Sequence, residues 1–166
     1  DEGVPATRTD LIREGLLVGR LHSRETAAKM GETPTGNARA INYRFPPIVR
    51  MTNTIIEPGE ATFDDLISDI KLGVYCGNWY GGMTSMEQFT FSAGEAHMIR
   101  NGRIAELVRP VLLSGNVFVT LKNLDAIGND LDINQGGGCG KSGQSPLPVS
   151  NGSPHIRLKR CLVGGG

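Results

Sequence analysis

The sequence predicts a mainly β protein with a few short helices, and three observations support this fold class. Glycine is frequent, at 23 of 166 residues, and each glycine inside a helix costs about 1 kcal/mol relative to alanine. Turn signals recur between short apolar segments. About three segments combine a helix cap with apolar residues at helical spacing. Because we find neither an internal repeat nor a long linker, we expect residues 1–166 to form a single β-rich domain.

The first elements are a hairpin and a short helix. Residues 11–18 contain two apolar segments on either side of Gly15, which suits the positive φ of a hairpin turn. Residues 23–30 begin with a serine cap and are followed by Gly31, as at many helix ends. Isoleucine and threonine dominate Ile48–Ile56, so we expect one extended strand there.

A capping box predicts the next helix. Thr62 and Asp65 have the required spacing, and the helix should extend over residues 63–72 and end at Gly73. Its apolar stripe consists of Phe63, Leu66, Ile67 and Ile70.

Strands follow this helix. We expect strands at 74–79 and 88–93 around a Gly81-Gly82 loop, and a hairpin that turns at Asn101-Gly102. Asn116 is the expected cap of a third helix.

The last forty residues differ in character. Residues 129–152 are polar and are expected to form a loop, whereas residues 155–163 alternate between apolar and polar and should form one final strand.

Charge and cysteine content exclude several classes of protein. Seventeen basic and seventeen acidic residues cancel, so binding to nucleic acid through charge is not expected. Three cysteines are too few and of the wrong parity for a disulfide framework, which favours a reducing, cytoplasmic location. No apolar run is long enough to cross a membrane, so no membrane partner is expected. The first residue is not methionine, so we expect the chain to be a piece of a longer protein.

The glycine-rich segment at 136–144 is the most distinctive local signal. Gly140-Lys141-Ser142 matches the end of a phosphate-binding loop, but Gln135 stands where that motif needs its first glycine. Residues 130–134 are too polar for a buried strand, and prolines at 146 and 148 prevent an immediate helix. The phosphate-loop interpretation therefore fails.

Cys139 is the candidate reactive residue of this segment. Glycines on both sides leave its thiol little covered, and Lys141 adds positive charge that favours the thiolate, the form that binds metals or attacks substrates. Alternatively, Cys139 is only a small residue that fits a tight turn, and local sequence alone favours this interpretation. Cys76 and Cys161, placed in apolar strands, are expected to be small buried hydrophobic residues.

Other side chains carry weaker signals. His22, His97 and His155 are scattered, and we expect surface or strand-edge positions without a metal role. Asp65 and Asp69 should lie on the solvated face of their helix. Trp79 and Tyr80 form either a binding platform or, as we expect, the rim of the core. Asp64 is a third carboxylate of the same helix as Asp65 and Asp69, and we assign it no role.

Four sequence strings resemble the C-terminal domain of the TldD/PmbA family, whose members have also been called modulators of DNA gyrase. The resemblance covers nearly the whole chain and keeps the strings in order. It implies an antiparallel, barrel-like β domain of the TldD/PmbA type. The strings are Asp1-Glu2-Gly3-Val4-Pro5, Arg50-Met51-Thr52-Asn53-Thr54, Ile56-Glu57-Pro58-Gly59 and Gly138-Cys139-Gly140-Lys141-x-Gly143-Gln144.

The resemblance also implies a zinc peptidase activity in the cytoplasm. In active members a His-Glu-x-x-x-His helix supplies two zinc ligands and a general base, and a cysteine that Cys139 matches supplies the third ligand. That helix motif is absent from these 166 residues, and in the family it lies upstream. We therefore expect this chain alone to be inactive and to hold zinc weakly, with no catalytic residue and no assigned substrate-binding residue of its own. Members pair as homodimers or with a metal-free relative.

Three hypotheses follow, in order of preference. The first is the C-terminal domain of a zinc metallopeptidase that cleaves or matures peptides, with Cys139 as ligand and a strand edge that binds the peptide. The second is a non-enzymatic scaffold, dimerisation or peptide-binding module in which Cys139 is vestigial. The third is a thiol enzyme with Cys139 as nucleophile.

Overall fold

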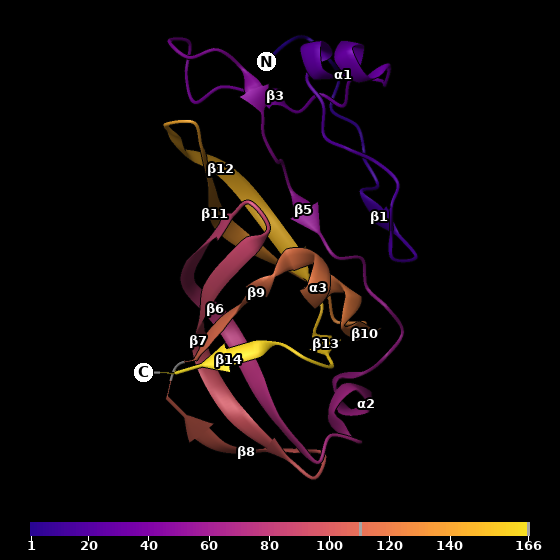
Figure 1. Cartoon of the computed structure of the whole chain (residues 1–166), viewed down its shortest axis with the longest axis vertical. Coiled ribbons are helices and arrows are strands. Elements are labelled where there is room, and N and C mark those ends of the chain that lie inside the picture. The colour runs from indigo at the N-terminus through magenta and orange to yellow at the C-terminus, as the bar shows by residue number, and fades with distance from the viewer. Residues whose placement is uncertain (110, 166) are drawn as a thin grey trace. The chain divides into compact units, whose positions relative to one another are not determined.

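The computed structural model describes residues 1–109 and 111–165, and strands dominate this part of the chain (Figure 1). This part of the chain contains three short helices, and most of its strand pairs are antiparallel. The predicted fold class is therefore confirmed. The helices are α1 (Arg24–Met30), α2 (Phe63–Ile67) and α3 (Val117–Lys122).

The chain forms two compact units, each built from two separate segments. Unit 1 combines Asp1–Ile56 with Asp132–Gly152, and unit 2 combines Glu57–Leu131 with the residues from Ser153 onward. Segments far apart in sequence therefore meet within each unit.

Unit 1 contains short strand pairs and one longer hairpin. The predicted first hairpin is confirmed, with its turn at Glu14 and Gly15, both at positive φ. Helix α1 is also confirmed, since the Ser23 side chain accepts the Thr26 N–H and Gly31 ends the helix in the left-handed region. The strands are β1 (Ile12–Arg13), β2 (Leu16–Leu17), β3 (Ala38–Arg39), β4 (Ile48–Val49), β5 (Thr54–Ile55), β11 (Asp132–Lys141) and β12 (Gln144–Ser153).

Two predictions in unit 1 were wrong. Residues 48–56 do not form one strand, because β4 pairs with β3 whereas β5 pairs in parallel with β12. Residues 129–152 are not a loop, because most of them form β11 and β12, which lie next to each other in one sheet with β5 (Figure 1). Glycine, proline and asparagine have low strand propensity, which hid both strands in the sequence.

Unit 2 is built around a long two-stranded ribbon with further strands on its edges. β7 pairs with β6 along almost its whole length and with β8 and β9 on its other side, and β14 pairs with β9. The strands are β6 (Leu72–Ser85), β7 (Gln88–Arg100), β8 (Arg103–Val108), β9 (Leu112–Asn116), β10 (Leu124–Ile127), β13 (Ile156–Leu158) and β14 (Leu162–Gly164).

Helix α2 packs its apolar stripe on this ribbon. Leu66 and Ile67 are buried together with Ile99 of β7, and Phe63 and Ile70 pack against them. The Thr62–Asp65 capping box is present, as predicted. The helix ends at Ile67, however, so residues 68–72 do not belong to it.

Four further predictions in unit 2 have different outcomes. The Asn101-Gly102 turn and the Asn116 cap are confirmed. The predicted Gly81-Gly82 loop is instead part of β6, where the pairing with β7 shifts register after Trp79. Residues 155–163 form two strands, β13 and β14, which pair with different partners.

Candidate functional site

Cys139 lies in β11, three residues before the turn that joins β11 to β12. The turn residues Ser142 and Gly143 have φ of 51° and 74°, as a two-residue hairpin turn requires. The Cys139 side chain is half-buried. The thiol therefore sits on a regular strand and not in an open glycine loop, which corrects our sequence interpretation.

The glycines beside Cys139 allow β12 to approach closely. A Cβ atom on Gly137 would lie 2.9 Å from the Val149 carbonyl oxygen, and one on Gly138 would lie 3.1 Å from the Pro146 side chain. Real Cβ atoms essentially never come within 3.0 Å of a backbone atom, so Gly137 has no substitute without a shift of the strands. These glycines serve strand packing, and no helix follows them to form a phosphate loop.

Arg50 fixes the backbone at Cys139. Its side chain is only 1% exposed, and its Nη2 donates to the carbonyl oxygens of Cys139 (2.5 Å) and Gln144 (3.1 Å). The Arg50 backbone is held in turn by Asn37, whose carbonyl accepts the Arg50 N–H at 2.8 Å and whose side-chain amide donates to the Arg50 carbonyl at 3.1 Å. A single guanidinium thus connects both strands of the hairpin to the segment after β4.

Gln144 connects the same hairpin to the segment between β3 and β4, and Lys141 connects it to β4 itself. The buried Gln144 amide accepts the Ile41 N–H at 2.9 Å and donates to the Pro46 carbonyl at 3.1 Å. Lys141 donates to the Val49 carbonyl at 2.8 Å. From the sequence we expected the positive charge of Lys141 to favour the Cys139 thiolate. In the structure the Lys141 ammonium instead donates to a backbone carbonyl.

Arg50 and Gln144 were not identified from the sequence as site residues. The signal that was available is a charged residue directly after the apolar Ile48-Val49 pair, in a segment predicted to be a strand. A buried arginine needs hydrogen-bond partners, and these come from residues about ninety positions away in the sequence.

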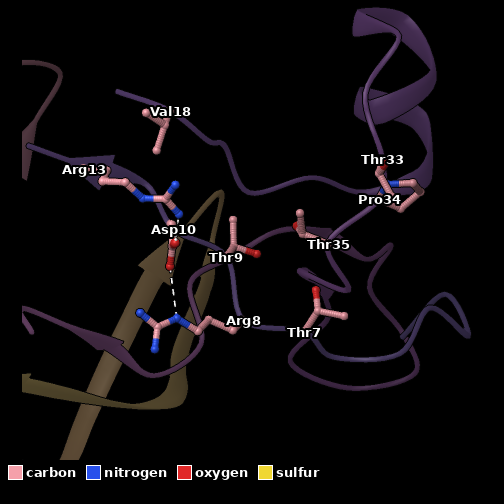
Figure 2. Close-up of a pocket in the computed structure, with 9 residues that line it drawn as sticks. All are labelled: Thr7, Arg8, Thr9, Asp10, Arg13, Val18, Thr33, Pro34 and Thr35. Atoms are coloured by element: carbon pink, nitrogen blue, oxygen red, sulfur yellow. Dashed lines mark hydrogen bonds and ion pairs between the residues drawn. The ribbon is translucent and has the colours of Figure 1, made fainter. Parts of the chain in front are cut away.

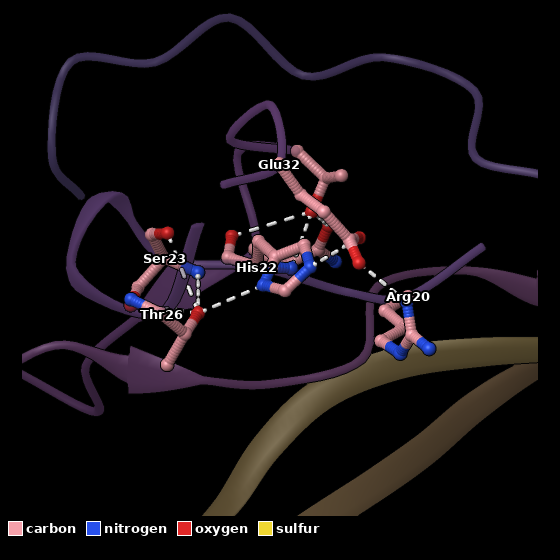
Figure 3. Close-up of polar contacts among 7 residues, drawn as sticks. Arg20, His22, Ser23, Thr26 and Glu32 are labelled. Atoms are coloured by element: carbon pink, nitrogen blue, oxygen red, sulfur yellow. Dashed lines mark hydrogen bonds and ion pairs between the residues drawn. The ribbon is translucent and has the colours of Figure 1, made fainter. Parts of the chain in front are cut away.

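His22 is buried, which our sequence interpretation placed wrongly at the surface. Its side chain is 3% exposed, with Nδ1 3.0 Å from the Thr26 hydroxyl and Nε2 2.8 Å from the Glu32 carboxylate (Figure 3). The His22 hydrogen bond is the main cause that lowers the pKa of Glu32, and the charge of Arg20 acts in the same direction. Both ring nitrogens already have partners, so His22 serves packing and not metal binding.

His155 joins a second polar cluster, in unit 2. Its backbone N–H and ring Nδ1 both lie within hydrogen-bond distance of the Asp130 carboxylate, at 2.9 and 2.5 Å, and its Nε2 lies 3.1 Å from the Tyr75 hydroxyl. These hydrogen bonds, the one from the backbone first, lower the pKa of Asp130, whereas burial raises the pKa of Tyr75. The Phe63 ring packs against both His155 and Tyr75, and His97 lies beside Tyr75. The cluster anchors strands, because each ring nitrogen of His155 has a partner.

The other two cysteines do not share the setting of Cys139. Cys76 lies in β6, and Cys161 lies just before β14 and not inside a strand as predicted. Burial raises the pKa of both thiols, which disfavours the thiolate. Both behave as small half-buried hydrophobic residues.

No group of three or more His, Cys, Asp or Glu side chains that could hold a metal ion is present among residues 1–109 and 111–165. Cys139 supplies one soft donor of the kind that zinc accepts, but structural and catalytic zinc sites use three or four protein ligands. The described residues therefore supply at most one ligand of a zinc site.

The surface of the chain offers two further features. A hollow of about 510 Å³ in unit 1 is lined by threonines and by Arg8, Asp10 and Arg13, whose ion pairs with one another cross it (Figure 2). Trp79 and Tyr80 on β6 are 56% and 84% exposed, so they do not form the core rim that we expected. In the part of the chain that the structure describes, no helix is long and apolar enough to span a membrane.

The described residues alone do not identify a protein family, whereas comparison with known proteins does. The chain is 59% identical over 165 residues to a metalloprotease of Synechocystis, covering 99% of the chain and 36% of that protein. It is 39% identical over 166 residues to a zinc metalloprotease TldD homolog of Saccharolobus solfataricus, covering 99% of the chain and 37% of that protein. The chain thus spans little more than a third of the length of these relatives.

Solved structures share the fold. TldE from Thermococcus kodakarensis superposes with a TM-score of 0.77 at 22% identity, over 98% of this chain and 35% of that one. A proposed DNA gyrase modulator from Thermotoga maritima superposes with a TM-score of 0.75 at 27% identity, over 99% of this chain and 34% of that one. The family profile described as the PmbA/TldA metallopeptidase C-terminal domain matches residues 1–165. The chain belongs to this family of metallopeptidase C-terminal domains.

Proposed function

We propose that this chain acts as the C-terminal domain of a zinc metallopeptidase that cleaves or matures peptides, and that Cys139 supplies one zinc ligand. The observation that carries the proposal is the setting of Cys139, a thiol that is half-buried on a strand whose backbone Arg50 holds. Family membership and the zinc metalloprotease name of one relative support it. The other ligands and the general base belong to the part of such a protein that this chain does not contain.

In this proposal the residues of this chain hold and orient the zinc ligand, and none of them acts as a nucleophile or general base. The hairpin of β11 and β12 presents the Cys139 side chain, and the contacts of Arg50 and Gln144 limit its movement. Bound zinc would polarise the scissile carbonyl and activate a water molecule. Because only one donor comes from this chain, we expect the chain by itself to bind zinc weakly and to cleave nothing.

The test is a substitution of Cys139 in the full-length protein. Cys139→Ser should abolish zinc content, measured by elemental mass spectrometry, and should abolish cleavage of a peptide library. Cys161→Ser is the matched control, because Cys161 is also half-buried but lies in the other unit, and it should retain zinc and activity. Zinc and activity that survive in the Cys139 variant would contradict the proposal.

Several exposed apolar side chains on and beside β6 favour an additional binding role. Besides Trp79 and Tyr80, Met83 and Met86 on and beyond β6 are 68% and 94% exposed. Aromatic residues and methionine are enriched at protein interfaces relative to the rest of the surface. We propose that this ribbon contributes to a dimer, with a second copy or a metal-free relative, in the cytoplasm. Met83→Asp should dissociate the full-length dimer in sedimentation analysis, and an unchanged mass would contradict this role.

A further inference from the structure

The Arg50 guanidinium bridges the two strands of the β11–β12 hairpin at the level of Cys139. A guanidinium carries five N–H donors, two of them on Nη2. Nη2 contacts the Cys139 and Gln144 carbonyl oxygens, whereas Nε and Nη1 are buried without a partner among the described residues. Neither does any described carboxylate pair with Arg50.

Fold stability alone does not explain a charge in this place. Burying a cation without a countercharge is unfavourable, and an apolar side chain of similar volume often fits such a position as well or better. What an apolar side chain lacks is the pair of hydrogen bonds to the two carbonyls. The function of Arg50 therefore depends on those carbonyls.

The carbonyl of Cys139 is the one whose position matters. Gly138 and Gly140 flank Cys139, and glycine restricts the backbone less than any other residue. The pairing of β11 with β12 limits this freedom, and the contact from Arg50 limits it further from outside the hairpin. Ligands of a metal site must be held close to their productive geometry by such outer contacts.

We propose that Arg50 is a positioning residue for Cys139, which fixes the Cys139 backbone and thereby the direction of its thiol. The role of the thiol as a zinc ligand rests on the proposed function, whereas the positioning rests on the contacts alone. Two measurements on the full-length protein test the positioning role and the zinc-ligand role separately.

Arg39 offers a matched control in the same unit. Its two terminal nitrogens also donate to two carbonyls, those of Met51 (2.8 Å) and Pro148 (2.9 Å), and Pro148 belongs to the same strand β12 as Gln144. Neither of these hydrogen bonds of Arg39 involves Cys139. Both substitutions remove two hydrogen bonds to backbone carbonyls. One of the two lost in Arg39→Met belongs to the hairpin, whereas both of those lost in Arg50→Met do, and only Arg50→Met releases the carbonyl of Cys139.

The first measurement needs no metal. The metal-free protein is treated with iodoacetamide, and alkylation of Cys139 and Cys161 is followed by peptide mass spectrometry. Arg50→Met should raise the rate at Cys139 several-fold and leave Cys161 unchanged, whereas Arg39→Met should leave both unchanged. An unchanged rate at Cys139, or an equal rise in the Arg39 variant, overturns the positioning role.

The second measurement uses the metal. Zinc affinity is determined by chelator competition, and the thiolate-to-cobalt absorption band is recorded after loading with Co²⁺. Arg50→Met should weaken zinc binding by about 10–100-fold, as loss of an outer contact does, and should shift the band. Wild-type affinity together with a wild-type band overturns the inference. If instead the unaltered protein lacks this band, the proposed zinc function fails, and the alkylation rates still decide the positioning.

A second variant covers the case in which Arg50→Met does not fold. Arg50→Lys keeps the charge, but its ammonium lacks the planar fork that spans both carbonyls. We expect the same changes at reduced size. Wild-type alkylation and affinity in the folded lysine variant overturn the inference.

Discussion

Arg157 of β13 donates two hydrogen bonds to the carboxylate of Asp125 in β10, each at 3.0 Å. Both side chains are less than a quarter exposed, and the pair lies across the two-stranded sheet that β10 and β13 form. The Arg157 guanidinium also reaches the Leu66 carbonyl at the end of α2. One side chain therefore connects a helix to two strands.

Loss of this pair should destabilise the protein. Asp125→Ala removes a two-bond carboxylate partner and leaves a largely buried guanidinium, so we expect the free energy of unfolding to fall by about 1.5–3 kcal/mol. Asp69→Ala is the control, because Asp69 pairs with the same guanidinium but is 71% exposed. The control should change stability by no more than about 1 kcal/mol in urea denaturation. Equal losses of unfolding free energy in the two variants would show that the two-bond pairing with Asp125 stabilises no more than the exposed pair with Asp69.

The Asp130–His155 pair should make stability depend on pH. The hydrogen bonds from His155 lower the pKa of Asp130 in the folded protein. A carboxyl with a lowered folded pKa stabilises at neutral pH, and this contribution is lost as the pH falls through that pKa, below roughly pH 4. Asp130→Asn should therefore be less stable than the unaltered protein at pH 7, and the gap should narrow on acidification. A gap that is constant with pH would contradict this origin.

Gly137 should tolerate no side chain. Its Cβ would lie 2.9 Å from the Val149 carbonyl oxygen, so Gly137→Ala must push β11 and β12 apart. We expect a loss of about 1–3 kcal/mol, as for other overpacked sites, and faster alkylation of Cys139 on the same strand. Gly81→Ala is the control, because a Cβ there meets nothing within 4 Å. Unchanged stability in the Gly137 variant would contradict the close approach of the strands.

The core under α2 should respond to truncation. Leu66 is buried against Ile67 and Ile99, so Leu66→Ala should cost about 2–5 kcal/mol. Leu72→Ala removes the same atoms from an exposed position and should cost about 0.5 kcal/mol or less. Thermal and urea unfolding measure both. Similar costs would mean that this cluster is not the core of unit 2.

Local signals in the sequence were sufficient for caps and turns. Ser23, Thr62 and Asn116 were predicted as helix caps, and Asn101-Gly102 as a turn, because the atoms that decide these features lie within a few residues. The lengths of elements were harder to predict. Helix α2 ends early because the residues from Leu72 onward pair with β7 over a long stretch, a contact between distant segments.

The candidate site at Cys139 shows the same contrast between local signals and contacts of distant residues. The sequence by itself determined the mainly β class and, through its resemblance to a family, pointed to Cys139 as the candidate zinc ligand. Only the tertiary structure decided that this residue lies on a strand, that its neighbouring glycines admit β12, and that Arg50 holds its carbonyl. The reason is physical: a buried guanidinium and a glycine contact are defined by partners about ninety and about twelve residues away, and such partners leave no periodic or local pattern in the sequence.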